Sequence, residues 1–189
     1  ISSMINQLKN AKLITDIIKE FYSTMWLLDS YWVSLSVRDE EDKSKYLGSD
    51  EVWAQAEWAL EEAAKANGLP YKRMPWEAAF YWPKLDFMFK DCIGREWQLA
   101  TIQCDFNLPQ RFNLSFTNEN NEEERPVVIH RAISWSLERW MWVLIEHFAW
   151  VFPTWLSPRQ VKVLPVLPKF DDYAQKIVNE LKASGIRVS

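Results

Sequence analysis

Two neighbouring segments alternate between polar and apolar residues, and this alternation constrains the fold more than any other feature of the sequence. The segments are residues 84–90 and 97–106, and the Ile93-Gly94 pair between them is typical of a tight turn. Successive side chains of a β-strand point to opposite faces, so this pattern predicts two strands. The sequence therefore predicts an antiparallel hairpin with one unusually polar face.

Amphipathic helices are predicted before and after this hairpin. Apolar residues recur at helical spacing over residues 4–25 and 51–66, with Ser49 or Asp50 placed to cap the second helix and Asn67-Gly68 placed to end it. Residues 31–37 alternate as a strand, and residues 134–150 predict a long helix. A second hairpin is predicted from strands at 111–117 and 126–133, with the acidic segment 118–124 as its solvated turn.

The fold class that follows is α+β, with a mainly antiparallel sheet flanked by helices. After Pro153 the pattern changes, because residues 161–166 predict a strand and residues 170–184 predict a helix. A β-then-α unit of this kind is typical of α/β domains. We therefore expect two domains, residues 1–155 and 156–189, with the chain only entering the second.

Composition narrows the class of protein. With 48% hydrophobic and 25% charged residues the chain is typical of globular proteins, and a net charge of -4 means that any RNA contact has to be local. No window approaches the ~20 apolar residues that span a bilayer, and no signal-peptide pattern opens the chain. Cys92 and Cys104 favour reduced thiols in a soluble cytosolic protein, with an oxidised pair as the alternative.

Thr101, Gln103 and Asp105 form the first group of candidate functional residues, because alternate residues of a strand share one face. Solvent exposure would explain any one of them taken singly. Aromatic residues interleaved with amide side chains also suit the floor of a ligand pocket, and the aromatic segment 79–84 leads directly into this hairpin.

His130 belongs to a second candidate group, at the point where a predicted strand runs into the long helix. The first turns of that helix carry Ser136 and Arg139, which suit an anionic, planar ligand such as a nucleotide. The alternatives are a hydrogen-bonded structural histidine and an arginine in an ordinary ion pair with Glu138.

Taken together and in this order, six segments closely resemble threonyl-tRNA synthetases. The resemblance covers nearly the whole chain, and its segments read KYLGSDEVW (45–53), AFYWPKLDF (79–87), KDCIGREWQLATIQCDFNLP (90–109), RPVVIHRAI (125–133), SLERW (136–140) and FPTWLSPRQV (152–161). It implies a partial class II catalytic core followed by the start of an anticodon-binding domain. The parent enzyme is expected to be a homodimer that activates threonine with ATP and Mg²⁺ and transfers it to tRNA(Thr).

The same resemblance implies roles for individual residues. Tyr81, Lys84 and Gln103 match positions around the threonyl-adenylate, where Lys84 is expected to balance carboxylate and phosphate charge. Arg139 matches the arginine that lies against adenine, a role suited to a planar cation. Polar positions lining the nucleotide and amino-acid pocket are matched by Gln98 and Ser136.

His130 matches one of three ligands of a zinc ion that binds the amino and hydroxyl groups of threonine and rejects valine. In the family, the other two ligands, the dimer-interface motif and the arginine that holds the α-phosphate all lie in sequence before the segment that Ile1 begins. One histidine does not build a closed zinc site. We therefore expect this chain alone to have neither bound zinc nor synthetase activity.

Tryptophan is several times more frequent than composition leads one to expect, with twelve in 189 residues. Where the family has glycine, this chain has Trp82, Trp135, Trp142 and Trp150, and Trp76 is a further candidate. Each indole adds ~200 Å² of side-chain surface, so the adenine site is expected to be obstructed.

Two hypotheses account for these tryptophans. One is that UGA codons, read as glycine in the source organism, were translated as tryptophan, whereas Trp53, Trp97 and Trp155 are genuine. The other is a synthetase-derived pseudoenzyme that acts as a binding or scaffold module.

The incomplete ligand set predicts the zinc content of the isolated chain. After incubation with zinc at neutral pH and desalting, elemental analysis is expected to find far less than one zinc per chain, with the same result for His130→Ala. One tightly held zinc per unmutated 189-residue chain, absent from the variant, would contradict this expectation.

Overall fold

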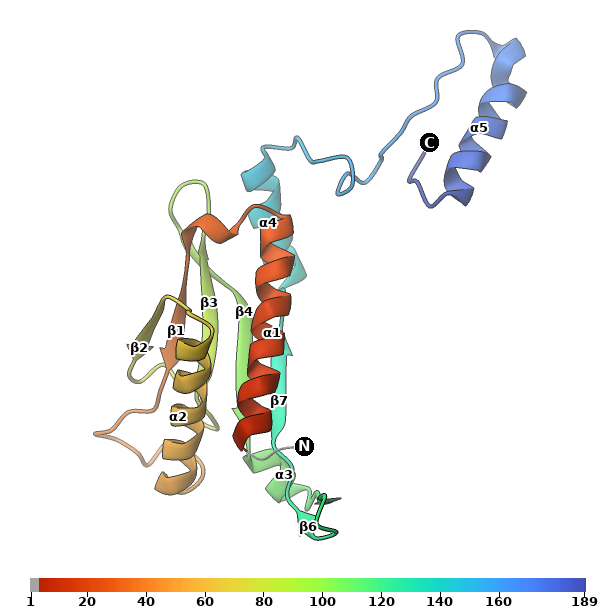
Figure 1. Cartoon of the computed structure of the whole chain (residues 1–189). Helices are drawn as coiled ribbons and strands as arrows, with labels where there is room; N and C mark the ends of the chain where they lie inside the picture. The colour runs from red at the N-terminus through yellow and green to blue at the C-terminus, as the bar shows by residue number, and fades with distance from the viewer. Residues whose placement is uncertain (1–3) are drawn as a thin grey trace. The chain divides into compact units, whose positions relative to one another are not determined.

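A five-stranded sheet organises the first part of the computed structural model, which describes residues 4–189 (Figure 1). The strand order is β2-β1-β3-β4-β7, in which β1 and β2 are parallel and all the other neighbours are antiparallel. The mainly antiparallel sheet predicted from the sequence is confirmed. Its strands are β1 (Tyr31–Ser36), β2 (Tyr71–Met74), β3 (Lys84–Lys90), β4 (Glu96–Asp105) and β7 (Val128–Ala132).

The predicted hairpin is formed by β3 and β4. Lys84 pairs with Gln103 at its open end and Lys90 pairs with Glu96 beside the turn, with one irregularity in register between Phe87 and Met88. Gly94 has a φ of 84°, as the tight turn requires. This hairpin occupies the centre of the sheet.

Two helices cover one face of the sheet (Figure 1). Helix α1 (Met4–Thr24) and helix α2 (Asp50–Ala66) lie side by side, and both were predicted. The Tyr22 ring of α1 is fully buried and stacks on Phe89 of β3 with centroids 4.0 Å apart. Ser49 caps α2 by accepting the N–H of Val52 at 3.5 Å, as the sequence predicted.

The opposite faces of the sheet differ in polarity. The face that packs against the helices is apolar and fully buried, with Val33, Leu35, Leu85, Phe87 and Ile102 as its central residues. Burial of side chains of this size stabilises the fold by roughly 1.5–3 kcal/mol each. The intervening residues of the same strands are polar and lie on the other face.

The second predicted hairpin is wrong in its pairing. The segment 126–133 supplies β7, which pairs with the free edge of β4 rather than with residues 111–117. Helix α3 (Asn107–Arg111) precedes the earlier segment and ends at its first residue, and Asp105 starts this helix by accepting the backbone N–H groups of Asn107 and Leu108. Only a small sheet of β5 (Phe116–Thr117) and β6 (Glu123–Glu124) remains around the acidic turn.

The chain divides into two compact units, Ile1–Val143 and Leu144–Ser189, within helix α4 (Leu137–Phe148). In the second unit, helix α5 (Asp171–Ala183) follows the 3-10 turn η2 (Pro168–Phe170), as predicted. The strand predicted over 161–166 is wrong, because only Val161 forms a β-bridge there, with Val188. Pro165 and Pro168 lack the N–H groups that a longer ladder needs.

Two further properties bear on the sequence predictions. No helix within residues 4–189 is long and apolar enough to cross a membrane. Both cysteines are thiols rather than a disulfide, and burial raises the pKa of the Cys104 thiol to about 12, so it stays protonated at neutral pH.

Asp91 holds the turn of the β3–β4 hairpin. Burial by itself would raise the pKa of this carboxyl, but hydrogen bonds from the Trp97 indole, the Arg95 side chain and two backbone N–H groups outweigh burial and lower the pKa to about 2. A carboxylate whose pKa is lowered on folding stabilises the fold above its ordinary pKa and loses that effect as the pH falls through its folded pKa.

We therefore predict that Asp91→Asn lowers the free energy of unfolding at neutral pH, and that the difference from the parent shrinks as the pH falls from about 4 to about 2. Urea unfolding followed by circular dichroism at several pH values measures this difference. The exposed Asp29, changed to Asn, is the matched control. A difference for Asp91→Asn that stays constant over this range would show that the turn carboxylate is not responsible.

Candidate functional site

A row of polar side chains crosses four strands on the face of the sheet away from α1 and α2. Ser36 of β1 lies opposite Lys84 of β3, Lys84 lies opposite Gln103 of β4, and Gln103 lies opposite His130 of β7. Residues directly opposite each other in an antiparallel pair place their side chains on the same face about 5 Å apart. The register therefore brings together three of the predicted site residues.

A cavity of about 470 Å³ lies over one end of this row. Its polar lining includes Tyr81, Thr101, Gln103, Asp105 and His130, together with Arg111 and Arg131. Thr101, Gln103 and Asp105 are 8%, 7% and 1% exposed, so solvent exposure is wrong as an explanation of these three residues. They form the floor of a pocket, and the two arginines give it positive charge.

The Asp86 carboxylate organises the middle of the polar face. One oxygen accepts Thr101 Oγ1–H at 2.7 Å and Gln98 Nε2–H at 2.6 Å, and the other accepts the Lys84 ammonium and Ser36 Oγ–H. Asp86 is only 3% exposed, and a buried carboxylate needs such donors to remain charged. Two predicted site residues, Lys84 and Gln98, are thereby fixed by a carboxylate that the sequence analysis did not select.

Asp105 plays the corresponding part at the end of β4. Its Oδ1 accepts the Trp82 indole N–H at 2.7 Å and two N–H groups of α3, while its Oδ2 lies 2.8 Å from His130 Nε2. His130 is therefore oriented by a carboxylate at the edge of the cavity. A histidine that binds a metal commonly has its second ring nitrogen held in this way.

The residues present do not by themselves fit a zinc ion. A zinc site in a protein takes at least three side-chain ligands, and no group of three histidine, cysteine, aspartate or glutamate residues with suitable geometry occurs within the part of the chain that the structure describes. His130 supplies one nitrogen, and its neighbour Asp105 is engaged by four donors.

Arg139 and Ser136 lie at the start of α4. The Arg139 guanidinium stands 5.6 Å from the centroid of the Trp97 ring and its Nη1 donates to the Gln98 carbonyl at 3.4 Å. Ser136 Oγ accepts the Arg139 N–H at 3.2 Å, so it caps the helix, and it donates to Glu138 at 2.9 Å. Arg139 is thus held beside Gln98 and the polar face rather than in an ion pair with Glu138.

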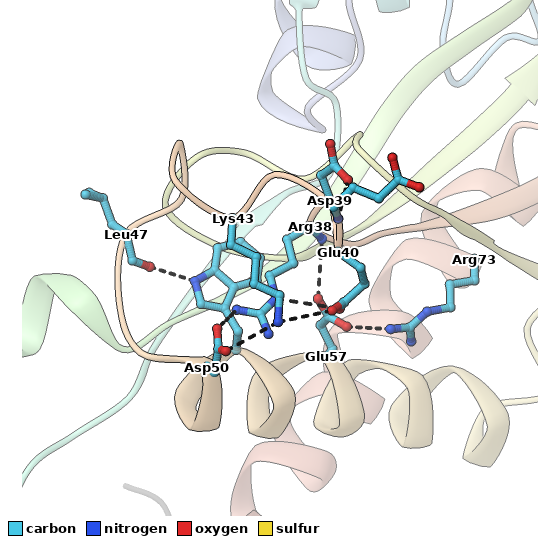
Figure 2. A network of polar contacts seen from close by, with 10 residues as sticks. Arg38, Asp39, Glu40, Lys43, Leu47, Asp50, Glu57 and Arg73 are labelled. Carbon is cyan, nitrogen blue, oxygen red and sulfur yellow. Dashed lines mark hydrogen bonds and ion pairs between the residues drawn. The ribbon is translucent and has the colours of Figure 1, made fainter.

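A polar network fixes the loop that forms one wall of the cavity (Figure 2). Buried Arg38 donates to Asp50 at 2.6 Å, and its backbone N–H donates to Glu57 at 3.3 Å. The loop returns through Leu47, whose carbonyl accepts the Trp53 indole N–H at 2.6 Å and whose N–H donates to the Phe80 carbonyl at 2.8 Å. Leu47 is thereby held against the cavity that it lines.

The tryptophans at the site differ in their environment. Trp82 is 1% exposed, stacks on Trp53 with centroids 5.6 Å apart, and does not line the cavity described above. Trp135 does line it, and its indole N–H donates to Thr101 Oγ1 at 2.7 Å. Of these two, Trp135 is the one that occupies space above the polar face.

Comparison with known proteins places this geometry in a family. Residues 6–148 match the profile of the tRNA synthetase class II core domain (G, H, P, S and T). The chain belongs to this class II tRNA synthetase family. The match covers the sheet, the two helices on its apolar face, the cavity and α4.

Close relatives within this family are threonine–tRNA ligases. The ligase of Parabacteroides distasonis is 51% identical over 174 residues, which are 92% of this chain and 27% of the relative. That of Rhodopirellula baltica is 52% identical over 162 residues, 86% of this chain and 22% of the relative. The chain thus spans 27% or less of the length of these two synthetases.

Two solved structures resemble the chain as well. The RNA binding domain of threonyl-tRNA synthetase from Cryptosporidium parvum Iowa II has a TM-score of 0.84 and 37% identity, covering 97% of this chain and 45% of that one. A putative threonyl-tRNA synthetase from Aeropyrum pernix has a TM-score of 0.66 and 32% identity, and the match covers 95% of this chain and 44% of that one. The resemblance to threonyl-tRNA synthetases seen in the sequence is confirmed, as is the α+β fold.

Sequence reasoning missed several residues of this candidate site. Asp86 is not identified from the sequence, because an aspartate on an alternating strand is usually interpreted as solvent-facing. Asp105 is identified only as sharing a face with Gln103. Arg111 lies outside the six family segments, and Arg131 lies within segment 125–133 without a role of its own assigned there. A usable signal existed for the carboxylates, since both lie on the same strand faces as the predicted residues Lys84 and Gln103.

We predict that Asp105→Ala lowers the free energy of unfolding by about 2–4 kcal/mol, because it leaves buried N–H groups without an acceptor. Urea unfolding measures the loss. Asp16→Ala is the control, since it removes an exposed pair with Lys12 (3.0 Å) and is expected to cost less than about 0.5 kcal/mol. Equal losses for the two variants would contradict a structural role for Asp105.

Proposed function

We propose that this chain is the later part of the catalytic core of a threonine–tRNA ligase, together with the start of its anticodon-binding domain, divided near residue 156. The parent protein activates threonine with ATP and transfers it to tRNA(Thr). The observation that carries this proposal is the joint presence of about 50% identity to threonine–tRNA ligases and a polar cavity built from the predicted residues.

The cavity suits an aminoacyl-adenylate, which has a polar amino acid at one end and a phosphate diester in the middle. We assign the amino-acid end to Tyr81 and Gln103, which line the cavity. Lys84 lies opposite Gln103 and supplies a cation on the same face, and Arg111 and Arg131 supply two more at the cavity wall. Cations fixed where phosphate charge develops stabilise the transition state of phosphoryl and acyl transfer.

Arg139, Gln98 and Ser136 form the nucleotide side of the proposed site. A guanidinium held over an aromatic ring, as Arg139 is over Trp97, is suited to stacking on a planar base. Gln98 Nε2 is fixed by Asp86 and Thr101, which leaves the side-chain oxygen Oε1 for a ligand. Ser136 sets the start of α4 and so the position of Arg139.

His130 is the single zinc ligand that this chain would contribute in the proposed enzyme. The remaining ligands would come from residues outside this sequence, and the zinc would bind the amino and hydroxyl groups of threonine. Mg²⁺ would accompany ATP. We further propose that the parent is a homodimer and acts in the cytoplasm, where tRNA and ATP are available.

A pseudoenzyme that serves as a binding or scaffold module is the second candidate function. It is favoured by one observation, the Trp135 indole that lies in the cavity and bonds to Thr101. An indole at this position takes space that a substrate would need.

The test uses the longest product of the gene that contains this chain. We predict threonine-dependent ATP–pyrophosphate exchange and charging of tRNA(Thr), with Arg139→Ala lowering kcat/KM for ATP about 10²-fold. Lys12→Ala, a change on the exposed face of α1, is the control and is expected to leave the rate unchanged. A folded product that binds tRNA(Thr) but shows no exchange would exclude the ligase and support the binding module.

A further inference from the structure

All five α-helices within residues 4–189 end in the same hydrogen-bonded motif, and its key position is glycine after α2 and α5, Asn113 after α3, Ala149 after α4 and tryptophan after α1. At the end of α2 the Gly68 N–H bonds to the Lys65 carbonyl and the next N–H bonds to the Ala64 carbonyl. Gly185 makes the same pair of bonds after α5, and Trp26 makes it after α1, with distances of 2.9 and 3.0 Å. This motif requires a left-handed residue, which is usually glycine.

The backbone angles agree with the hydrogen bonds. Gly68 and Gly185 have φ values of 59° and 78°, and Trp26 has a φ of 55°. Trp76, in the turn after β2, and Trp150, just after α4, both have a φ of 68°. A bulky residue at positive φ is a steric outlier, because its Cβ approaches the backbone too closely.

Other residues with positive φ do not share this conflict to the same degree. Asn113 and Asn121 belong to a residue type that tolerates the left-handed region, and all four glycines of the chain also lie there. Ala149, with a φ of 45°, carries only a methyl side chain. Ordinary composition would give a chain of this length about 13 glycines, so glycine is depleted where tryptophan is in excess. The three strained tryptophans are 59%, 63% and 75% exposed, so burial does not account for them.

A second group of tryptophans is well accommodated. Trp53 donates its indole N–H to the Leu47 carbonyl and is fully buried, and Trp97 donates to Asp91. Neither has a positive φ. The chain therefore contains two kinds of tryptophan. Some are hydrogen-bonded at ordinary backbone angles, and others lie at backbone angles that are strained for a bulky residue.

Trp135 is unsuited to its position for a different reason. Its ring lies over the polar floor of the cavity and its indole N–H takes the Thr101 hydroxyl, which already bonds to Gln98 and Asp86. A residue without a side chain there would open the cavity towards Thr101. Trp82, in contrast, is buried with its N–H satisfied by Asp105, and its backbone makes no demand for glycine.

We propose that the functional protein carries glycine at positions 26, 76, 135 and 150, because UGA codons in its gene are read as glycine, and that its cavity is consequently open above Thr101. The argument for positions 26, 76 and 150 rests on backbone geometry alone. The consequence for position 135 rests on the proposed ligase function.

The codons and the native protein test the origin of these residues. We expect UGA at positions 26, 76, 135 and 150 and UGG at positions 53, 97 and 155. Peptide mass spectrometry of the protein isolated from its source is expected to show glycine at the first four positions. UGG at position 26 or 150, or tryptophan in the corresponding native peptide, would overturn the proposal.

The stability of designed variants tests the backbone argument independently of the gene. At positions 26, 76 and 150 we expect glycine variants of the 189-residue chain to melt about 2–4 °C above the matching alanine variants, because only glycine enters the left-handed region freely. Trp58, half-exposed within α2, is the matched control, and there Trp58→Ala is expected to melt above Trp58→Gly. Alanine variants that equal or exceed glycine variants at all three positions would overturn the argument.

Binding of a non-hydrolysable threonyl-adenylate analogue to the longest gene product tests the open cavity. Calorimetry is expected to show at least about tenfold tighter binding for Trp135→Gly than for the tryptophan form, since the indole no longer competes for Thr101. Unchanged binding, with UGA codons confirmed, would leave the glycine assignment standing and count against the proposed ligase site. Unchanged binding together with UGG at position 135 would overturn both the glycine assignment at that position and its functional consequence.

Discussion

The register between β3 and β4 is the constraint on which the rest of this structure depends. With Lys84 opposite Gln103 and Leu85 opposite Ile102, the buried apolar residues Leu85, Phe87 and Ile102 face the helices, whereas Lys84, Asp86, Thr101 and Gln103 lie on the other face. A shift of one residue would exchange the two faces, burying the charges against α1 and α2. The same register extends through β7 and places His130 in line with Gln103.

Two buried carboxylates make that polar face stable. Asp86 and Asp105 are 3% and 1% exposed. The partners of Asp86 come from β1, β3 and β4, and those of Asp105 come from Trp82, α3 and β7. Ionised groups at this depth are tolerated only when they are paired and hydrogen-bonded. The side chains that bond to them, Lys84, Gln98 and His130 among them, are consequently held in fixed positions before any ligand binds. Such fixed positions are the preorganisation that a catalytic site needs.

Local patterns in the sequence predicted the elements whose cause is local. The periodicity of α1 and α2, the Ser49 cap and the β3–β4 hairpin follow from spacing and turn chemistry, and all were confirmed. The pairing of β7 with β4 and the parallel neighbour β2 were not predictable in this way, because they join segments that are distant in sequence. The polar face was predicted from the alternation in β4. The roles of Asp86 and Asp105 were not predictable in this way, because they depend on hydrogen-bond partners from neighbouring segments.

The conformation at a helix end is set by its neighbours rather than by the residue that occupies it. After α1, the carbonyls of Tyr22 and Ser23 take the N–H groups that follow, and these two bonds fix the left-handed angle at position 26 whatever its side chain. The backbone therefore indicates which residue suits a position even where the sequence names another. The left-handed backbone at Trp26 and the crowded cavity at Trp135 then have a common explanation in glycine, one through conformation and the other through space.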